Sequence, residues 1–298
     1  MKNINKAIPI IFFILICSVI FLAGCSENLN NEPDSGSSIV DIYIPGYEKA
    51  DVIIITTENN TIMIDTGLGK MVNNIVDYLV SHDCVKIDYL IITHFDNDHI
   101  GTADRIIGKF PIGEVIVPNY EKDSKLYNLF IESVKEMELT QIILTDTMEF
   151  TLDGVEFTLY PSEREYRDYN DENNESSDES DENNYSIAVT MIHGNNKFFF
   201  AGDAMAERID ELLELDEIKN TEYDFLKVPH HGKYNKRIKK FISAINPHYA
   251  VITCSSDKPA DDKVISALNK AKAEIFLTSD GNIYCQSDGD NIAVSILP

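Results

Sequence analysis

The chain lacks several signatures that would assign it to common protein classes. It has five cysteines in 298 residues and no Cys-x-x-Cys pair, so neither a disulfide-stapled fold nor a cysteine-type zinc ribbon fits. It also has no glycine-rich dinucleotide motif and no P-loop motif. Any enzymatic chemistry must therefore come from other side chains.

Basic residues are also scarce. The chain has 25 Lys and Arg against 50 Asp and Glu, which gives a formal net charge of −25. Such a surface repels nucleic acid and anionic lipid headgroups at long range, and it weighs against tight non-specific DNA binding. It is compatible with a phosphodiester substrate that a metal holds at a local site.

The N-terminus carries an apolar run, Ile8 to Leu22, behind Lys2 and Lys6. The run is about 15 residues long, whereas a transmembrane helix needs about 20. Leu22-Ala23-Gly24-Cys25 follows it. We therefore predict a signal peptide with a lipobox over residues 1–24. An uncleaved single-pass anchor is the alternative.

The resemblance of this segment to bacterial lipoproteins implies cleavage before Cys25 and acylation of its thiol. Residues 25–38 would then be the lipidated cysteine and a polar tether. We expect the protein on the extracellular face of the cell membrane, lipid-anchored through Cys25.

Residues 39–298 are predicted to form one domain of α/β class. Apolar patterns predict strands at 40–44, 52–57, 61–64, 87–92, 115–117, 142–144, 149–152, 155–160, 186–192, 197–201, 225–228, 249–253, 275–277, 282–286 and 292–296. Helical spacing predicts helices at 70–80, 103–108, 124–137, 206–215, 236–245 and 261–272. Two similar halves of this kind fit two sheets with helices outside.

An acidic insertion at about 162–184 separates the two halves. It has almost no apolar residues, so burial cannot hold it folded, and we expect a disordered segment. The alternative is a weak calcium-binding lid, but no regular oxygen-ligand loop with its glycine turn is visible.

The most informative stretch is residues 93–101, Thr-His-Phe-Asp-Asn-Asp-His-Ile-Gly, directly after a predicted buried strand. It crowds four potential metal ligands into one loop, namely His94, Asp96, Asp98 and His99. Imidazole and carboxylate together suit divalent cations such as Zn, Mn or Fe. Three other strand-like runs end in a potential ligand beside a glycine, and these ligands are Asp65, Asp203 and the pair His230-His231.

In this order the motifs resemble those of the metallo-β-lactamase-fold hydrolases, and within them the soluble domain of ComEC-type DNA-uptake proteins and their stand-alone relatives. The resemblance runs from about residue 39 to the C-terminus. It implies a four-layer αβ/βα sandwich and a metallo-hydrolase with two divalent metal ions, Zn²⁺ or Mn²⁺.

The resemblance also implies a ligand set. His94 and Asp96 would hold the first ion, Asp98 and His99 the second, and Asp203 would bridge both. One of His230 and His231 completes the second site. His231 is favoured as this ligand, and His230 would then donate a hydrogen bond to an oxyanion or a phosphate. Asp98 would also orient the hydroxide that attacks the substrate, and Asp65 would orient the loop by accepting hydrogen bonds.

Two departures from the superfamily pattern are typical of the ComEC-type group. Asp96 stands where a histidine is usual, and Asn183-Asn184 stands where a third histidine ligand would precede a strand. Asn184 is expected beside the first ion in a supporting position. Oxygen-rich ligation should weaken this first site and move its preference from Zn²⁺ toward Mn²⁺ or Mg²⁺.

The leading functional hypothesis is a metal-dependent phosphodiesterase, with nuclease action on DNA as one form, which uses a metal-bound hydroxide outside the cytoplasm. One alternative is a cell-surface esterase that cleaves phosphodiesters of wall or choline-bearing polymers. Another is a non-catalytic surface-binding lipoprotein. The sequence leaves open the substrate, the oligomeric state and any pairing among Cys84, Cys254 and Cys285.

Overall fold

The computed structural model describes residues 38–46, 48–164 and 180–297. The predicted signal peptide, Cys25, all but the last residue of the tether and the centre of the acidic insertion lie outside these residues. Within the described ranges, no helix combines the length and the apolar character needed to cross a bilayer. Cys84, Cys254 and Cys285 are free thiols.

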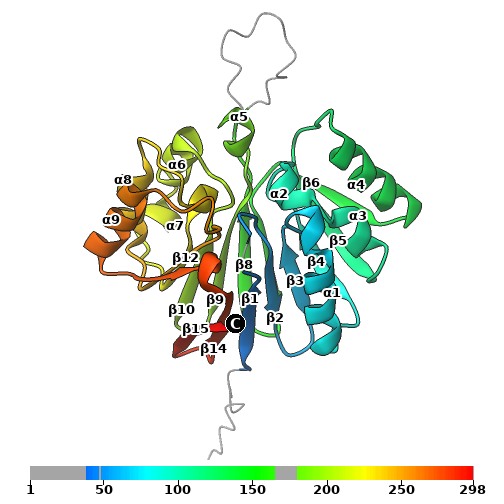
Figure 1. The fold of residues 1–298 in the computed structure, drawn as a ribbon, viewed down its shortest axis with the longest axis horizontal. Coiled ribbons are helices and arrows are strands. Elements are labelled where there is room, and N and C mark those ends of the chain that lie inside the picture. Colours follow the sequence, from blue (N-terminus) through cyan, green and yellow to red (C-terminus); the bar gives the residue numbers. More distant parts are fainter. Residues whose placement is uncertain (1–37, 47, 165–179, 298) are drawn as a thin grey trace, which may run out of the picture. The chain divides into compact units, whose positions relative to one another are not determined.

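Two mixed sheets form the centre of the domain (Figure 1). The eight-stranded sheet has the order β15 (Ile292–Leu297), β14 (Asn282–Ser287), β1 (Val40–Ile44), β2 (Ile53–Thr56), β3 (Thr61–Ile64), β4 (Ile87–Ile91), β5 (Ile112–Pro118) and β6 (Thr140–Leu144). The seven-stranded sheet has the order β13 (Glu274–Leu277), β12 (Tyr249–Ile252), β11 (Phe225–Lys227), β10 (Asn196–Phe200), β9 (Ala188–His193), β8 (Val155–Tyr160) and β7 (Met148–Leu152).

The helices lie outside the sheets, as Figure 1 shows for the larger ones. Along the first half run α1 (Val72–Ser81), α2 (Asn97–Ile100), α3 (Ala103–Ile107) and α4 (Lys125–Glu136). Along the second half run α5 (Ser180–Asn183), α6 (Ala206–Leu212), α7 (Asp216–Lys219), α8 (Ile238–Ile245) and α9 (Asp262–Ala271). Short 3₁₀ turns are η1 (Gly69–Met71), η2 (Pro229–Gly232) and η3 (Thr278–Asp280).

Three apolar cores follow from this layering. The alternating apolar residues of both sheets, such as Ile55 and Phe198, pack between the sheets. The outer face of the first sheet packs against the apolar stripes of α1, α3 and α4, and the outer face of the second packs against those of α6, α8 and α9. The predicted four-layer αβ/βα sandwich is therefore confirmed.

Strand direction determines where polar loops gather. Strands β3 to β6 run parallel to one another, and so do β10 to β13. Parallel strands present their carboxyl ends at one edge, where α/β proteins place their ligand sites. The predicted ligands follow β3, β4, β10 and β11, so the fold carries them to such edges.

The structure differs from the expected elements in three places. The loop after β4 contains the helical turn α2, because the backbone N–H groups of His99 and Ile100 both donate to the Asp96 carbonyl. The helix expected over 206–215 ends at Leu212, and α7 follows it. Near the end of the predicted acidic insertion the chain forms α5, and its last residue, Asn183, and the following Asn184 are buried.

Candidate metal centre

Asp65 anchors the centre from the end of β3. One carboxylate oxygen accepts the Thr93 backbone N–H at 2.8 Å, and the other accepts the Thr93 hydroxyl at 2.7 Å and His99 Nδ1 at 2.6 Å. Asp65 is buried, and its backbone φ is +58°, a conformation that aspartate tolerates better than most residues. Because Nδ1 of His99 donates to Asp65, Nε2 is the nitrogen that can offer a lone pair to another partner once it has lost its proton. Asp65 thus holds the loop and orients an imidazole.

The loop after β4 supplies four candidate ligands, as predicted from its sequence. His94 and His99 are fully buried, and their ring centroids lie 3.9 Å apart. Asp98 lies in the first turn of α2 with 24% of its side chain exposed. Asp98 therefore connects the buried histidines to solvent.

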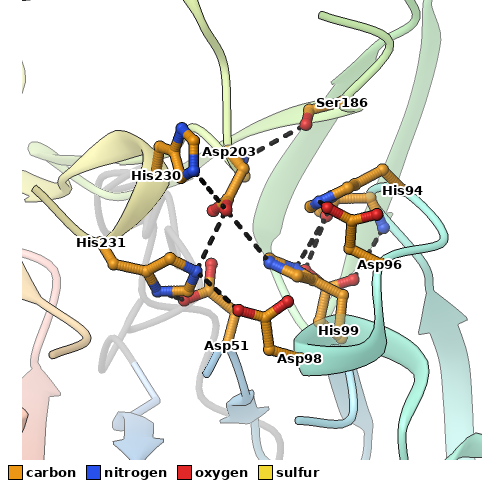
Figure 2. A network of polar contacts seen from close by, with 12 residues as sticks. Asp51, His94, Asp96, Asp98, His99, Ser186, Asp203, His230 and His231 are labelled. Atoms are coloured by element: carbon orange, nitrogen blue, oxygen red, sulfur yellow. Dashed lines mark hydrogen bonds and ion pairs between the residues drawn. The ribbon is translucent and has the colours of Figure 1, made fainter. Parts of the chain in front are cut away.

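Asp203 occupies the middle of the cluster (Figure 2). It follows β10 after Gly202, whose φ of +53° turns the chain beside Ser186 and Thr93. Its Oδ2 lies 3.0 Å from His231 Nε2 and 3.4 Å from His99 Nε2. Nearby positive groups, His231 first among them, hold the pKa of Asp203 well below its usual value, although burial alone would raise it. Asp203 is therefore an ionised carboxylate shared by histidines of both halves of the sandwich.

The paired histidines occupy different positions. Both have positive φ in the turn η2. His231 is within hydrogen-bond distance of the Thr253 carbonyl through Nδ1 at 2.9 Å, and its Nε2 lies 3.3 Å from Asp98 Oδ2. His230 Nε2 lies farther out, 3.9 Å from Asp203 Oδ2. This geometry favours His231 as a ligand.

His230 has a different hydrogen-bonding role from the expected one. Its Nδ1 lies 2.9 Å from the Met205 sulfur, which accepts hydrogen bonds but cannot donate them, so we assign the ring hydrogen to Nδ1. Burial lowers the pKa of His230 to about 4, so the ring is neutral near pH 7. Nε2 then presents a lone pair. The predicted donation to an oxyanion or a phosphate does not follow from this arrangement, which makes Nε2 an acceptor.

Two residues that the sequence analysis missed support this cluster. Asp51, which precedes β2, and Lys227, at the end of β11, are both fully buried and form an ion pair. Lys227 Nζ also donates to the Gly202 carbonyl at 3.1 Å and lies 3.5 Å from Asp203 Oδ1. Asp51 accepts the Thr253 hydroxyl at 2.6 Å. The available signal was a lysine inside an otherwise apolar strand, because a buried lysine needs a carboxylate partner.

Asp96 stands apart from the other ligand candidates. Its Oδ2 lies 3.6 Å from His94 Nε2, and its Oδ1 accepts from Lys122 Nζ at 2.7 Å. Lys122 also donates to Glu182 of α5 at 2.5 Å. Burial alone would lower the pKa of Lys122, but the hydrogen bonds to both carboxylates outweigh it and raise the pKa. Burial raises the pKa of Glu182. Burial would also raise the pKa of Asp96, but His94 and Lys122 lower it, so Asp96 is ionised beside the lysine.

Asn184 does not point its amide at the centre. Its Oδ1 accepts the backbone N–H of Arg208, and its Nδ2 donates to Glu207 at 3.0 Å, so it fastens the start of α6. The neighbouring Asn183 is buried, and its Oδ1 makes no hydrogen bond. Of the two asparagines, Asn183 therefore carries the uncommitted oxygen.

The described side chains fit a divalent cation. The groups with ligand atoms within 4.8 Å of one another are His94-His99-Asp203, Asp98-His99-His231, Asp51-Asp203-His231 and Asp51-Asp65-His99. The Nε2 atoms of His94, His99 and His231 are buried and make no hydrogen bond. An unpaired buried polar group costs roughly 1–3 kcal/mol, and here three of them lie beside carboxylates. Ions held by the first two of these groups would give all three nitrogens a partner.

Protonation of the histidines reflects the same surplus of negative charge. Burial alone would lower the pKa of both His99 and His231. The carboxylate of Asp203, helped by Asp65 or Asp51, raises both pKa values instead. Protons therefore take the place that a bound cation would fill, and they must leave when it binds.

Comparisons with known proteins identify the family of the chain. Residues 46–255 match the model of the metallo-β-lactamase superfamily. ComE operon protein 3 of Bacillus subtilis (strain 168) is 22% identical over 292 residues, which cover 89% of this chain and 34% of that protein. Competence protein ComA of Neisseria gonorrhoeae is 25% identical over 236 residues, 78% of this chain and 29% of that protein. This chain thus spans about a third of the length of these relatives.

Solved structures agree on the fold. The metallo-β-lactamase fold protein YhfI from Bacillus subtilis superposes with a TM-score of 0.50 at 11% identity, over 81% of this chain and 96% of that chain. At this identity the likeness concerns the fold alone. Together with the family match, it identifies the chain as a member of the metallo-β-lactamase superfamily of metal-dependent hydrolases.

Proposed function

We propose that the protein is a metal-dependent phosphodiesterase. The observation that carries this proposal is a set of three buried imidazole nitrogens without hydrogen bonds, of which His231 Nε2 lies beside Asp98 and Asp203, His99 Nε2 beside Asp203, and His94 in one group with His99 and Asp203. The likeness to competence proteins supports a phosphodiester as the substrate class. The net charge of −25 counts against long DNA as the preferred substrate, because it repels a polyanion, and it favours small phosphodiesters.

The proposed ligands are His94, His99, His231, Asp98 and Asp203, with Asp96 at the edge of the set. A divalent ion held there supplies Lewis acidity, because it lowers the pKa of water and polarises a phosphoryl oxygen. Hydrogen bonds from His99 Nδ1 to Asp65 and from His231 Nδ1 to Thr253 fix both rings with Nε2 inward.

Two side chains are placed to handle the attacking water. Asp98 is ionised, since His231 and His99 lower its pKa despite its burial, and its partly exposed oxygens can accept a hydrogen bond from that water. Neutral His230 presents Nε2 as a second acceptor near Asp203. With both acceptors present, the water's lone pair can be aimed at phosphorus.

The test is hydrolysis of bis-p-nitrophenyl phosphate, DNA and a wall-derived phosphodiester by the full chain with Mn²⁺ or Zn²⁺. We expect turnover of at least one phosphodiester, and loss of turnover on addition of a chelator. A protein that binds metal but hydrolyses none of the three would contradict the proposal. A protein that binds no metal would favour a non-catalytic surface role.

We also propose that the protein acts outside the cytoplasm as a lipoprotein, on the basis of Leu22-Ala23-Gly24-Cys25. Cys25→Ala should release the protein from the membrane fraction or leave it unprocessed, because the acyl signal is lost. Unchanged fractionation and mobility of the variant would refute the anchor without affecting the metal centre.

A further inference from the structure

The two halves of the metal centre differ in the groups that contact their carboxylates. In one half, Asp98 Oδ2 lies 3.3 Å from His231 Nε2, and Asp203 Oδ2 lies 3.4 Å from His99 Nε2. These residues belong to two groups of potential ligands that share His231, namely Asp98-His99-His231 and Asp51-Asp203-His231. We call this arrangement of Asp98, His99, His231 and Asp203 the inner half.

The other half, which we call the outer half, contains His94 and Asp96, and His94 shares a group of potential ligands with His99 and Asp203. This outer half already contains a cation. Lys122 Nζ holds Asp96 Oδ1 at 2.7 Å and Glu182 Oε2 at 2.5 Å. Only 20% of the Lys122 side chain is exposed, so water screens its charge weakly. Across the described ranges, Asp96 joins none of the histidine and carboxylate groups that could surround an ion.

We propose that Lys122 weakens ion binding at the outer half, so that the protein holds one divalent ion tightly in the inner half and a second only weakly. The ammonium neutralises Asp96, and it repels a dication that approaches His94 Nε2. Glu182 keeps the ammonium in place from α5. The inference rests on the metal centre proposed above, but not on the identity of the substrate.

The opposite role for Lys122 predicts the opposite result. If the lysine held Asp96 Oδ1 so that Oδ2 could bind the ion, its removal would weaken binding of the second ion. If the lysine competes with the ion, its removal strengthens binding of the second ion. The sign of the change in affinity therefore decides between the two roles.

The experiment titrates the full chain with Mn²⁺ alone and follows free Mn²⁺ by electron paramagnetic resonance. For the wild type we expect one tight ion and a second with a Kd at least about tenfold higher. Lys122→Met should lower the second Kd at least about tenfold. Lys122→Gln should have the same effect, and it replaces Lys122→Met if that variant folds poorly. Lys122→Arg keeps the charge and should leave the second Kd unchanged.

Lys49 provides a matched control for loss of charge, because its Nζ lies 3.5 Å from Asp98 Oδ2 and its side chain is similarly exposed, at 28%. Lys49→Met should leave the second Kd unchanged. Two equal Mn²⁺ sites in the wild type, or a second Kd that rises or stays constant in Lys122→Met, would overturn the inference. The titration measures no turnover, so a failed phosphodiesterase assay leaves its outcome readable.

Discussion

Replacing Lys227 with methionine should cost the metal-free protein roughly 3–5 kcal/mol of unfolding free energy, the range for breaking a buried ion pair by removing one partner. The lysine is fully buried, and it is the cation closest to Asp51. Methionine fills a similar volume, but it removes the ammonium from Asp51 and from Asp203, whose Oδ1 lies 3.5 Å from it, and leaves Asp51 with only His231 Nδ1 at 3.4 Å as a nearby ion-pair partner. Such a loss is a large fraction of the roughly 5–15 kcal/mol that stabilises a typical domain.

The assay is urea unfolding in the presence of a chelator, followed by circular dichroism. Asp51→Asn and the double variant complete a double-mutant cycle, and the double variant should be more stable than the sum of the single losses by about 1–3 kcal/mol. Added Mn²⁺ should restore part of the stability of Lys227→Met, because a dication compensates the same carboxylates. A loss below about 1 kcal/mol without metal would refute the argument that this pair is required to bury Asp51.

Three further predictions concern the centre itself. Asp65→Asn should weaken Mn²⁺ binding about 10–100-fold, because the His99 ring loses the carboxylate that orients it. Asp153→Asn is the control: it alters a carboxylate that accepts several hydrogen bonds elsewhere, and it should leave the Mn²⁺ affinity unchanged. Calorimetric titration compares the two variants. His231→Ala should lose the tight ion, while His230→Ala should keep it and lower kcat about 100-fold or more, as elemental analysis and steady-state kinetics would show. The apparent Mn²⁺ affinity should rise at least about tenfold from about pH 6 to about pH 8. The reason is that the pKa values of His99 and His231 are raised, and both rings must lose protons to bind metal. An affinity that stays constant over that range would contradict the assignment of both histidines as ligands.

The layers and most strand positions could be predicted from sequence, because buried strands leave a clear apolar pattern. The ligand loops were also visible, since each follows such a strand and carries histidine or aspartate beside glycine. α2 was missed because its four residues are too few to show helical periodicity. The backbone hydrogen bonds to the Asp96 carbonyl form this turn.

The pairing of charges could not be predicted in this way. Asp51 lies in a polar stretch before β2, and its partner Lys227 is 176 residues away. Lys122 lies 40 residues before the acidic insertion and Glu182 near the end of it, so only the folded chain brings them together at Asp96. Likewise, sequence places Asn183 and Asn184 side by side, but packing determines that Asn184 bonds to the start of α6.

The central claim is that the cluster of His94, His99, His231, Asp98 and Asp203 binds at least one catalytic divalent ion. It is tested most directly by measuring metal content and bis-p-nitrophenyl phosphate hydrolysis on the same preparations of wild type and Asp98→Ala. We predict at least one tightly bound ion and chelator-sensitive turnover in the wild type, and turnover reduced to background in a folded Asp98→Ala. A wild type without bound metal, or an Asp98→Ala variant with full activity, would contradict the account.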